Sequence, residues 1–493
     1  MFAFASRAQA EELLFWDNYS ATPGSIAFSS ITGSGGAALN FGATKLESPE
    51  GIAYDRVTNR IYVASPGTGA NGELLFVNLD GSGGGVFAPT GVPIENPLGV
   101  AIDPVTRMIY WVNGEGPGEP DGSIAGANLD TGAGSLLNTA GAPLNDPYRI
   151  ALDTVDGRVY WTNETPDPEK IGFANVNGTG GGELPTTGAT PPNGITGLAV
   201  DEVSRRLFWI DSTGVSFASL AGGAGGDVDI TGSVYNGPYG MAVDPTLNRV
   251  YWANYSNAEV RAGAFGFAAV TGGGSTISPV EAPVNGPQDP LIIKSPGGTG
   301  APAVTRSASN RAALSCSTGS WGADFPGGFV YQSPRSFAYQ WYRNGVPIGG
   351  ATAPTFTATS PGSHTCAVTA TNQAGSATQG SGAVNVNAAK VKLTTKKKAK
   401  GEPGDLVKFK VKAVNQGDLK PKNAKVCVKL PKAAKDDLKA PKCKSLGQLK
   451  AGGKKTLTLK VEIKDAADEG IDKLTFQVKG SAGKAAKSKI IVG

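Results

Sequence analysis

A short apolar pattern that ends in aspartate recurs five times in the first half of the chain. Seven residues after each aspartate stands an aromatic residue, and a tryptophan follows it in four copies. Each copy therefore predicts a strand, a tight turn whose Asp side chain accepts backbone N–H groups, and a second strand. The copies are Gly-Ile-Ala-Tyr-Asp (51–55), Gly-Val-Ala-Ile-Asp (99–103), Arg-Ile-Ala-Leu-Asp (149–153), Gly-Leu-Ala-Val-Asp (197–201) and Gly-Met-Ala-Val-Asp (240–244).

The spacing of these copies indicates a repeat architecture. Successive copies lie 43 to 50 residues apart, which is the length of one four-stranded blade of a β-propeller. Phe15-Trp16 has the pattern of a second strand without a first, and Pro287 to Ile293 that of a first strand without a second. Joined in space, the two ends would form a sixth blade and leave no sheet edge open. The sequence therefore predicts a six-bladed β-propeller over residues 13–294.

One copy carries a family resemblance. Residues 197–212, Gly-Leu-Ala-Val-Asp-Glu-Val-Ser-Arg-Arg-Leu-Phe-Trp-Ile-Asp-Ser, resemble a YWTD repeat of the low-density-lipoprotein-receptor class B propeller. The resemblance spans all six blades, and bacterial secreted proteins with degenerate repeats are the nearer comparison. In that family the motif ends in an Asp that helps to tie neighbouring blades, and an amide or hydroxyl can also make such a tie. The equivalent positions here are Asn18, Ser65, Asn113, Asn163, Asp211 and Asn254.

A second domain is expected after a linker at residues 295–302, which are rich in Gly and Pro. Within residues 303–388, Cys316, Trp341 and Cys366 are separated by alternating strand-like segments. This order resembles an immunoglobulin-like sandwich in which the tryptophan packs on a disulfide. His364 stands two residues before the second cysteine, where that family has its corner tyrosine, so we expect a structural role for it.

Residues 389–493 alternate lysine with apolar residues, for example in Val407-Lys408-Phe409-Lys410-Val411-Lys412. A period of two predicts half-buried strands whose outer face carries lysine. The segment 404–417 resembles the small sandwich domains that are repeated in bacterial surface proteins. The expected fold class is thus all-β, with a six-bladed β-propeller followed by two immunoglobulin-like β-sandwich domains.

Charge is distributed unevenly along these domains. Residues 1–300 contain 13 Lys and Arg against 30 Asp and Glu, whereas residues 390–493 contain 28 Lys, no Arg and 10 acidic residues. Such asymmetry predicts an electrostatic partner. We expect the lysine-rich domain to attract an anionic cell-wall polymer. The alternatives are that it folds back on the acidic propeller, or that its lysines serve solubility. The lack of Arg and the scarcity of aromatic residues argue against nucleic acid.

The cysteines and the N-terminus point to an oxidising compartment. The four cysteines form two locally spaced pairs, Cys316 with Cys366 and Cys427 with Cys443, which favours two disulfides. Residues 1–12 are expected to be the remnant of a signal peptide, with Ala8-Gln9-Ala10 as its cleavage motif, or a disordered N-terminus. No apolar run approaches the roughly 20 residues that cross a bilayer. The expected location is extracellular or at the cell surface.

A candidate ligand-binding ring lies where the repeats differ, just before or at the glycine of each first strand. If the first strands line the channel, these residues surround its mouth and form a small binding surface; the alternative is that they are tolerant loop positions. The ring consists of Glu50, Leu98, Tyr148, Arg149, Thr196, Tyr239, Gln288 and Asp289.

Catalysis has little support in the sequence. His364 is the only histidine, which removes most His-assisted chemistry, and we find no metal-ligand cluster, phosphate loop or calcium loop. We therefore expect no cofactor, no metal and no enzymatic activity. The expected function is recognition of an extracellular protein or glycan by the propeller, with the sandwich domains as spacer and attachment. The alternative is an extracellular propeller hydrolase or lyase acting on a small molecule or glycan.

Overall fold

The computed structural model describes residues 12–67, 72–115, 121–164, 169–255 and 263–493. Except for Glu12, the segment that the sequence predicts to be a signal-peptide remnant or disordered N-terminus, residues 1–12, lies outside the described residues. Strands dominate the described part of the chain, which contains two short 3-10 helices and no α-helix. The predicted all-β class is confirmed. No helix in these ranges is long and apolar enough to cross a membrane.

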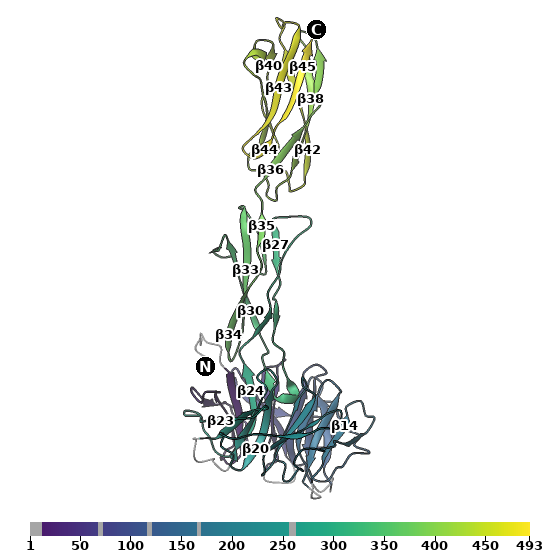
Figure 1. Ribbon diagram of the computed structural model, residues 1–493, viewed down its shortest axis with the longest axis vertical. Helices are drawn as coiled ribbons and strands as arrows, with labels where there is room; N and C mark the ends of the chain where they lie inside the picture. The colour runs from purple at the N-terminus through teal and green to yellow at the C-terminus, as the bar shows by residue number, and fades with distance from the viewer. Residues whose placement is uncertain (1–11, 68–71, 116–120, 165–168, 256–262) are drawn as a thin grey trace. The chain divides into compact units, whose positions relative to one another are not determined.

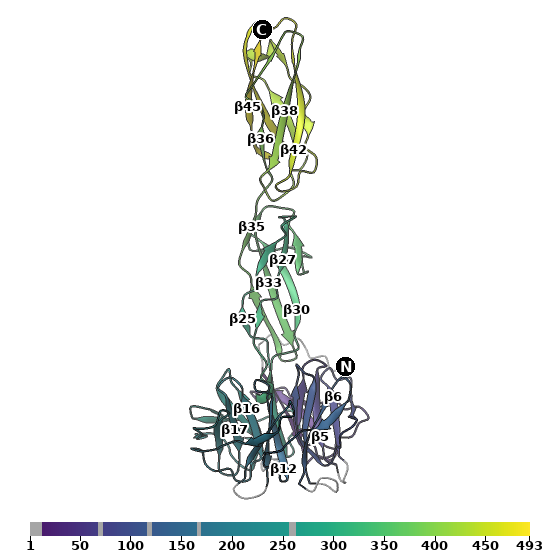
Figure 2. The same cartoon turned by 90° about the vertical axis from the view of Figure 1, so that its right-hand side faces the viewer.

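Six sheets form the blades of the propeller (Figure 1, Figure 2). The first strands of the six blades are β4 (Ile52–Asp55), β8 (Pro97–Asp103), β12 (Pro147–Asp153), β16 (Gly197–Asp201), β20 (Pro238–Asp244) and β24 (Pro287–Lys294). The second strands are β5 (Arg60–Ser65), β9 (Met108–Asn113), β13 (Arg158–Asn163), β17 (Arg206–Ile210), β21 (Arg249–Asn254) and β1 (Glu12–Asn18). Neighbouring first strands contact one another around the whole ring, so they line the channel.

The outer half of each blade consists of a third and a fourth strand. The third strands are β6 (Glu73–Asn78), β10 (Ser123–Asn128), β14 (Ile171–Asn175), β18 (Val215–Ser219), β22 (Phe265–Ala269) and β2 (Ser25–Ser30). The fourth strands are β7 (Gly84–Phe87), β11 (Gly134–Leu136), β15 (Gly181–Glu183), β19 (Gly226–Val228), β23 (Gly274–Ile277) and β3 (Ala37–Ala38).

The ring closes between its two ends, as the split motif predicts. Strand β1 pairs antiparallel with β24, with Phe15 opposite Leu291 and Leu13 opposite Ile293. Figure 1 shows β1, in purple, beside β24. On its other edge β1 pairs with β2, so the sixth blade contains strands from both ends of the propeller. Trp16 in this blade is fully buried.

The motif positions act as expected in turns and ties. Asp55, for example, accepts the N–H of Val57 at 2.9 Å in the turn between β4 and β5. Asn163 accepts the N–H of Asn145, 18 residues earlier, at 2.8 Å and so fixes the loop that leads into its blade. Asn113, Asn254 and Asn18 make the same kind of bond. Amide groups at these terminal positions thus hold the loops that lead into the blades.

A segment from beyond the propeller closes one end of its channel. Helix η2 (Pro326–Gly328) and strand β29 (Val330–Tyr331) lie against first strands of the blades, and β29 pairs parallel with β24. A Cβ on Gly327 would lie 2.2 Å from the carbonyl oxygen of Leu152, so only glycine fits this approach. We call residues 325–331 the plug. Nothing in the repeat pattern predicts it.

Other contacts hold the plug and its flanks in place. The buried Asp324 forms an ion pair with Arg56, and Tyr331 packs edge-on against Tyr54 with ring centroids 5.1 Å apart. By its contacts the chain forms two compact units, and residues 322–336 and 370–377 belong with residues 1–297 in the first. From the sequence, both segments were expected in the domain that follows. The predicted domain limits are otherwise untested and stay predictions.

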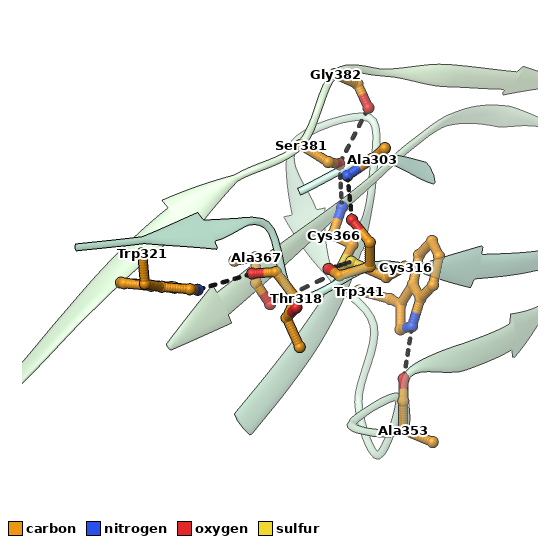
Figure 3. Close-up of a disulfide and its surroundings, with 11 residues drawn as sticks. Ala303, Cys316, Thr318, Trp321, Trp341, Ala353, Cys366, Ala367, Ser381 and Gly382 are labelled. Carbon is orange, nitrogen blue, oxygen red and sulfur yellow. Dashed lines mark hydrogen bonds between the residues drawn. A yellow bond between two sulfur atoms is a disulfide. The ribbon is translucent and has the colours of Figure 1, made fainter. Parts of the chain in front are cut away.

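A small β-sandwich follows the propeller along the chain, and most of its residues belong to the second unit. Its strands are β25 (Gly298–Gly300), β26 (Val304–Arg306), β27 (Ala313–Cys316), β28 (Ser320–Trp321), β30 (Ser336–Arg343), β31 (Val346–Pro347), β32 (Thr355–Thr357), β33 (Gly362–Asn372), β34 (Gly375–Gly380) and β35 (Val384–Val386). Strand β25 lies inside the predicted linker 295–302. Cys316 and Cys366 form a disulfide between β27 and β33, with Trp341 beside it (Figure 3). His364 is buried, and its Nδ1 lies 3.0 Å from the Gly362 carbonyl oxygen.

Residues 389–493 form a second sandwich of two five-stranded sheets. One sheet contains β36 (Lys390–Thr394), β38 (Leu406–Asn415), β40 (Leu438–Lys439), β42 (Lys454–Ile463) and β44 (Ala482–Lys484). The other contains β37 (Lys398–Gly401), β39 (Lys425–Lys429), β41 (Lys444–Ser445), β43 (Gly470–Lys479) and β45 (Ala486–Val492). Along β38, buried Val407, Phe409 and Val411 alternate with exposed lysines, as predicted. A disulfide joins Cys427 to Cys443.

Candidate functional site: the mouth of the propeller channel

The first strands approach one another closely where they begin, at the end of the channel opposite the plug. A Cβ on Gly51 would lie 2.7 Å from the Leu98 carbonyl oxygen, and one on Gly240 would lie 2.4 Å from the backbone N of Asp289. Glycine is therefore needed for this approach. We call this narrow part of the channel the neck, and the surface around its outer side the mouth.

Arg149 replaces the glycine of the repeat and sends its side chain across the neck. Its Nη1 lies 3.4 Å from a carboxylate oxygen of Asp289 and 3.9 Å from one of Glu50. Its Nη2 donates to Gln288 Oε1 at 3.1 Å, and its Nε donates to the Thr196 carbonyl at 3.1 Å. The side chain is only 3% exposed. Arg149 therefore acts as an internal counter-ion that links the blades.

Three carboxyl groups surround this one guanidinium. Besides Glu50 and Asp289, the third is Asp17 on β1, which is fully buried and has no hydrogen-bond partner on either carboxylate oxygen. Burial raises the pKa of all three groups, and the charge of Asp289 further raises that of Asp17. Arg149 lowers each pKa in part. The neck thus holds three carboxyl groups and one guanidinium. Protonation of these carboxyl groups should therefore change the stability of the propeller.

The sequence contains a signal for Asp17, although the predicted ring leaves this residue out. The position after the Trp of the repeat is apolar or uncharged in the other blades, where it holds Ala64, Val112, Thr162, Ile210 and Ala253. Asp17 is the one acidic residue among the six equivalent positions, which indicates that its side chain has different surroundings from the other five. Strand β1 places it against the neck.

Four tyrosines form a continuous row at the mouth, which we call the tyrosine row: Tyr148, Tyr239, Tyr255 and Tyr19. Successive ring centroids lie 6.2, 5.6 and 6.2 Å apart. The guanidinium carbon of Arg149 lies 4.3 Å from the Tyr148 ring centroid and 4.9 Å from that of Tyr239, so these rings cover the cation. Tyr19 and Tyr255 were not predicted, although each directly follows the terminal Asn of its second strand.

Hydrogen bonds orient the rings of the row. Tyr148 donates its hydroxyl to Glu50 Oε2 at 3.0 Å, and the hydroxyls of Tyr148 and Tyr239 also bond to each other. Burial raises the pKa of Tyr148, so its hydroxyl stays protonated and remains a donor. Further along the row, the Tyr255 hydroxyl lies 3.1 Å from Ser20 Oγ. Phenol rings, hydroxyl groups and one carboxylate therefore meet at the mouth, where Tyr148 and Glu50 are largely buried and Tyr19, Tyr239 and Tyr255 are partly exposed.

The structure brings together six of the eight residues predicted for the ring: Glu50, Tyr148, Arg149, Tyr239, Gln288 and Asp289. The other two border this group: Leu98 through apolar packing and Thr196 through hydrogen bonds. Leu98 packs in an apolar cluster with Tyr148 and Ile150. Thr196 donates its hydroxyl to the Pro238 carbonyl at 2.7 Å and contributes only its own carbonyl to Arg149. The ring as a ligand-binding site stays a prediction.

Below the neck the channel is nearly filled. The cavity between neck and plug leaves about 10 Å³ open to the centre of a water molecule, and Arg149, Asp289 and Phe329 are among its lining residues. That is close to the minimum for one buried water. The channel below the neck therefore has no room for a ligand larger than a water molecule. Among the described residues, no group of three or more His, Cys, Asp or Glu side chains is placed to hold a metal ion.

Comparison with known proteins identifies no family for this chain. No family model matches it, and no curated protein matches it. Solved structures with a similar fold include the nidogen/laminin complex, with 19% identity, a TM-score of 0.45 and coverage of 57% of this chain and 98% of that chain. TolB from Acinetobacter baumannii shows 13% identity and a TM-score of 0.42 over 57% of this chain and 66% of its own.

A gluconolactonase from Xanthomonas campestris is also similar, with 16% identity, a TM-score of 0.33 and coverage of 52% of this chain and 90% of that chain. The propellers that resemble this chain thus include an enzyme as well as a protein solved in a complex. At these identities and scores the likeness concerns the fold and does not indicate a function.

Proposed function

We propose that this chain is a secreted or cell-surface recognition protein whose propeller binds an extracellular protein or glycan at the tyrosine row without transforming it. The observation that carries the proposal is the row itself, which stands over a neck that Arg149 and the plug leave closed. Tyrosine rings offer a large contact area with little side-chain entropy to lose, and they are enriched where proteins bind partners. The sandwich domains would then serve as spacer and attachment.

The surroundings of the row favour a partner with cationic or hydroxyl groups. Glu50 is 11% exposed in its side chain and accepts the Tyr148 hydroxyl. Glu164, in the loop after β13, has a raised pKa because it is partly buried and because Asp146 and Glu169 lie near it. Carboxylates thus accumulate on this side of the propeller. They would attract a cation from solution and accept hydrogen bonds from sugar hydroxyls.

We also propose that the propeller is related to the YWTD class. This rests on the repeat pattern and on the blade ties at its terminal positions, which Asn18, Asn113, Asn163 and Asn254 make with amide groups. An extracellular location fits the two disulfides, Cys316–Cys366 and Cys427–Cys443.

A hydrolase or lyase is the second candidate, and one observation favours it. Glu50 lies at the mouth with a pKa raised by burial, which is a property of general acids. However, its carboxylate accepts the Tyr148 hydroxyl and lies near the Arg149 cation, so its proton is not presented to an open pocket. We therefore favour binding over catalysis as the function of this site.

A substrate screen separates the two candidates. We expect no turnover above the buffer rate when the full chain meets panels of lactones, esters and glycans, with or without added divalent metal ions. Glu50→Gln should behave in the same way as the natural chain because no reaction depends on the carboxylate. Turnover that the natural chain supports and the Glu50→Gln variant loses would contradict the proposal and assign the mouth to catalysis. Turnover that needs an added metal ion would also contradict it.

A further inference from the structure

The lysine-rich sandwich keeps its positive and negative charges apart. Nine of its ten acidic residues lie at one end, where β38 and β43 begin and β37, β42 and β45 finish. The strand register fixes this, because Gly470 and Gly401 both pair with Val492, and Leu406 pairs with Glu462. The nine are Glu402, Asp405, Asp436, Asp437, Glu462, Asp465, Asp468, Glu469 and Asp472. The body of the sandwich is left with lysine.

Most of these lysines have no acidic neighbour. In residues 390–493, all of which the structure describes, Lys439 is the one lysine within ion-pair distance of a carboxylate, that of Glu462 at 3.0 Å. Lysines even stand directly opposite each other on antiparallel strands: Lys408 with Lys460, Lys425 with Lys479, and Lys473 with Lys489. Like charges in such pairs are destabilising. Solubility would be served as well by mixed charges, so the arrangement indicates an anionic partner.

Five lysines line one hollow on the surface of this sandwich. Its volume is about 770 Å³, and its lining includes β39, β43 and the segment that joins Lys429 to Cys443. The disulfide Cys427–Cys443 ties the end of that segment back to β39 and so holds the wall of the hollow. Its lining lysines, which we call the hollow lysines, are Lys429, Lys435, Lys439, Lys464 and Lys479.

Three of the hollow lysines are available to a ligand. Lys439 is paired with Glu462, and Lys464 donates its Nζ to the Lys435 carbonyl at 2.7 Å. Lys429, Lys435 and Lys479 are exposed, and their ammonium groups form no ion pair within the described chain. Three ammonium groups around one concave surface match an anion that repeats along a chain better than they match a single charge.

We propose that this hollow binds a linear acidic polymer through its repeated phosphate or carboxylate groups. Lysine supplies mobile point charges, which suit a flexible polymer rather than the fixed geometry of one bidentate ligand. Nucleic acid is disfavoured, because the two aromatic residues of this sandwich, Phe409 and Phe476, are fully buried and can stack on no base. The site is separate from the mouth of the propeller, and its function does not depend on the one proposed there.

The test compares two triple variants of the full chain that lose the same charge. The hollow triple removes three positive charges from the hollow and combines Lys429→Gln, Lys435→Gln and Lys479→Gln. The β38 triple removes three exposed lysines of β38, on the other sheet, and combines Lys408→Gln, Lys410→Gln and Lys412→Gln. Affinity for long-chain inorganic polyphosphate and for polygalacturonate is measured at low salt by fluorescence anisotropy. We expect the hollow triple to weaken binding at least about tenfold and the β38 triple much less, because contacted charges release the most counterions. Binding by the natural chain should fade by about 0.5 M salt.

A third variant keeps the charge. Replacing Lys429, Lys435 and Lys479 together by Arg should preserve binding, because the positive charge at these places stays. An unchanged melting temperature and circular dichroism spectrum of the Gln triple show that its loss of binding is not misfolding. Preference for polyphosphate or for polygalacturonate tells phosphate from carboxylate polymers, and either supports the proposal. Equal losses in the two Gln triples would overturn it, because binding would then follow net charge alone. A single-stranded DNA that binds tenfold tighter than polyphosphate of equal charge would also overturn it.

Discussion

Deletion of residues 1–25 should abolish folding of the whole propeller in a single step. The deletion removes β1, which pairs with β24 on one edge and β2 on the other, and it takes the fully buried Phe15 and Trp16 with it. The ring would then end in two open sheet edges, and a blade would be missing from the packing between its neighbours. We expect the near-ultraviolet circular dichroism of the propeller to be lost at temperatures where the natural chain is folded.

Deletion of the C-terminal strand from the lysine-rich sandwich is the control. Removing residues 486–493 takes away β45 and should disrupt the lysine-rich sandwich while leaving the propeller transition at its original temperature. A propeller transition that is unchanged after loss of residues 1–25 would contradict closure between the two ends.

Replacement of Arg149 by Met should destabilise the propeller strongly at neutral pH. The substitution keeps an apolar chain of similar length but leaves Asp17, Glu50 and Asp289 without their cation. Removing one partner of a buried pair typically costs about 3–5 kcal/mol, because the remaining charge is buried without compensation. Arg149→Lys should lose less, since it keeps the charge but lacks the planar group that reaches Gln288 and Thr196 together. Urea unfolding of the three proteins measures the differences.

The loss should shrink as the pH falls. The pKa values of the three carboxyl groups are raised in the folded state, so the folded chain binds more protons than the unfolded chain at pH values above about 4. Stability therefore decreases as the pH rises through this range and recovers as it falls. Without Arg149 the three pKa values rise further, and protonation then removes more of the penalty. A destabilisation that is the same at pH 5 and pH 8 would contradict the role of Arg149 as counter-ion.

The fold could be predicted largely because its information is local and repeated. A few consecutive residues determine each strand pair and its Asp turn. The split motif at Phe15-Trp16 and Pro287–Ile293 indicates ring closure. The plug could not be predicted in this way. It depends on Gly327 and Gly328, which have no counterpart in the repeats, and on contacts with strands more than a hundred residues earlier.

The site was predicted only in part, for a similar reason. Departures from the repeat identified Arg149 and Asp289, but they could not show that Arg149 points inward and is covered by Tyr148 and Tyr239. Tyr19 was missed because it lies after the motif, where the repeats share no pattern. Likewise, the alternation of lysine along β38 was readable from the sequence, whereas the gathering of acidic residues at one end of the sandwich required the register of all its strands.

The most direct test of recognition at the mouth is binding to an array of extracellular glycans and proteins. It compares the natural chain with Tyr19→Ala/Tyr255→Ala, which shortens the tyrosine row, and with Val105→Ala, which alters a residue 75% exposed at the opposite end of the propeller. We predict that ligands held by the natural chain lose at least about tenfold in affinity in the tyrosine variant, keep it in Val105→Ala, and are recovered unaltered by mass spectrometry. Equal binding by the natural chain and the tyrosine variant, or recovery of a chemically changed ligand, would contradict the account.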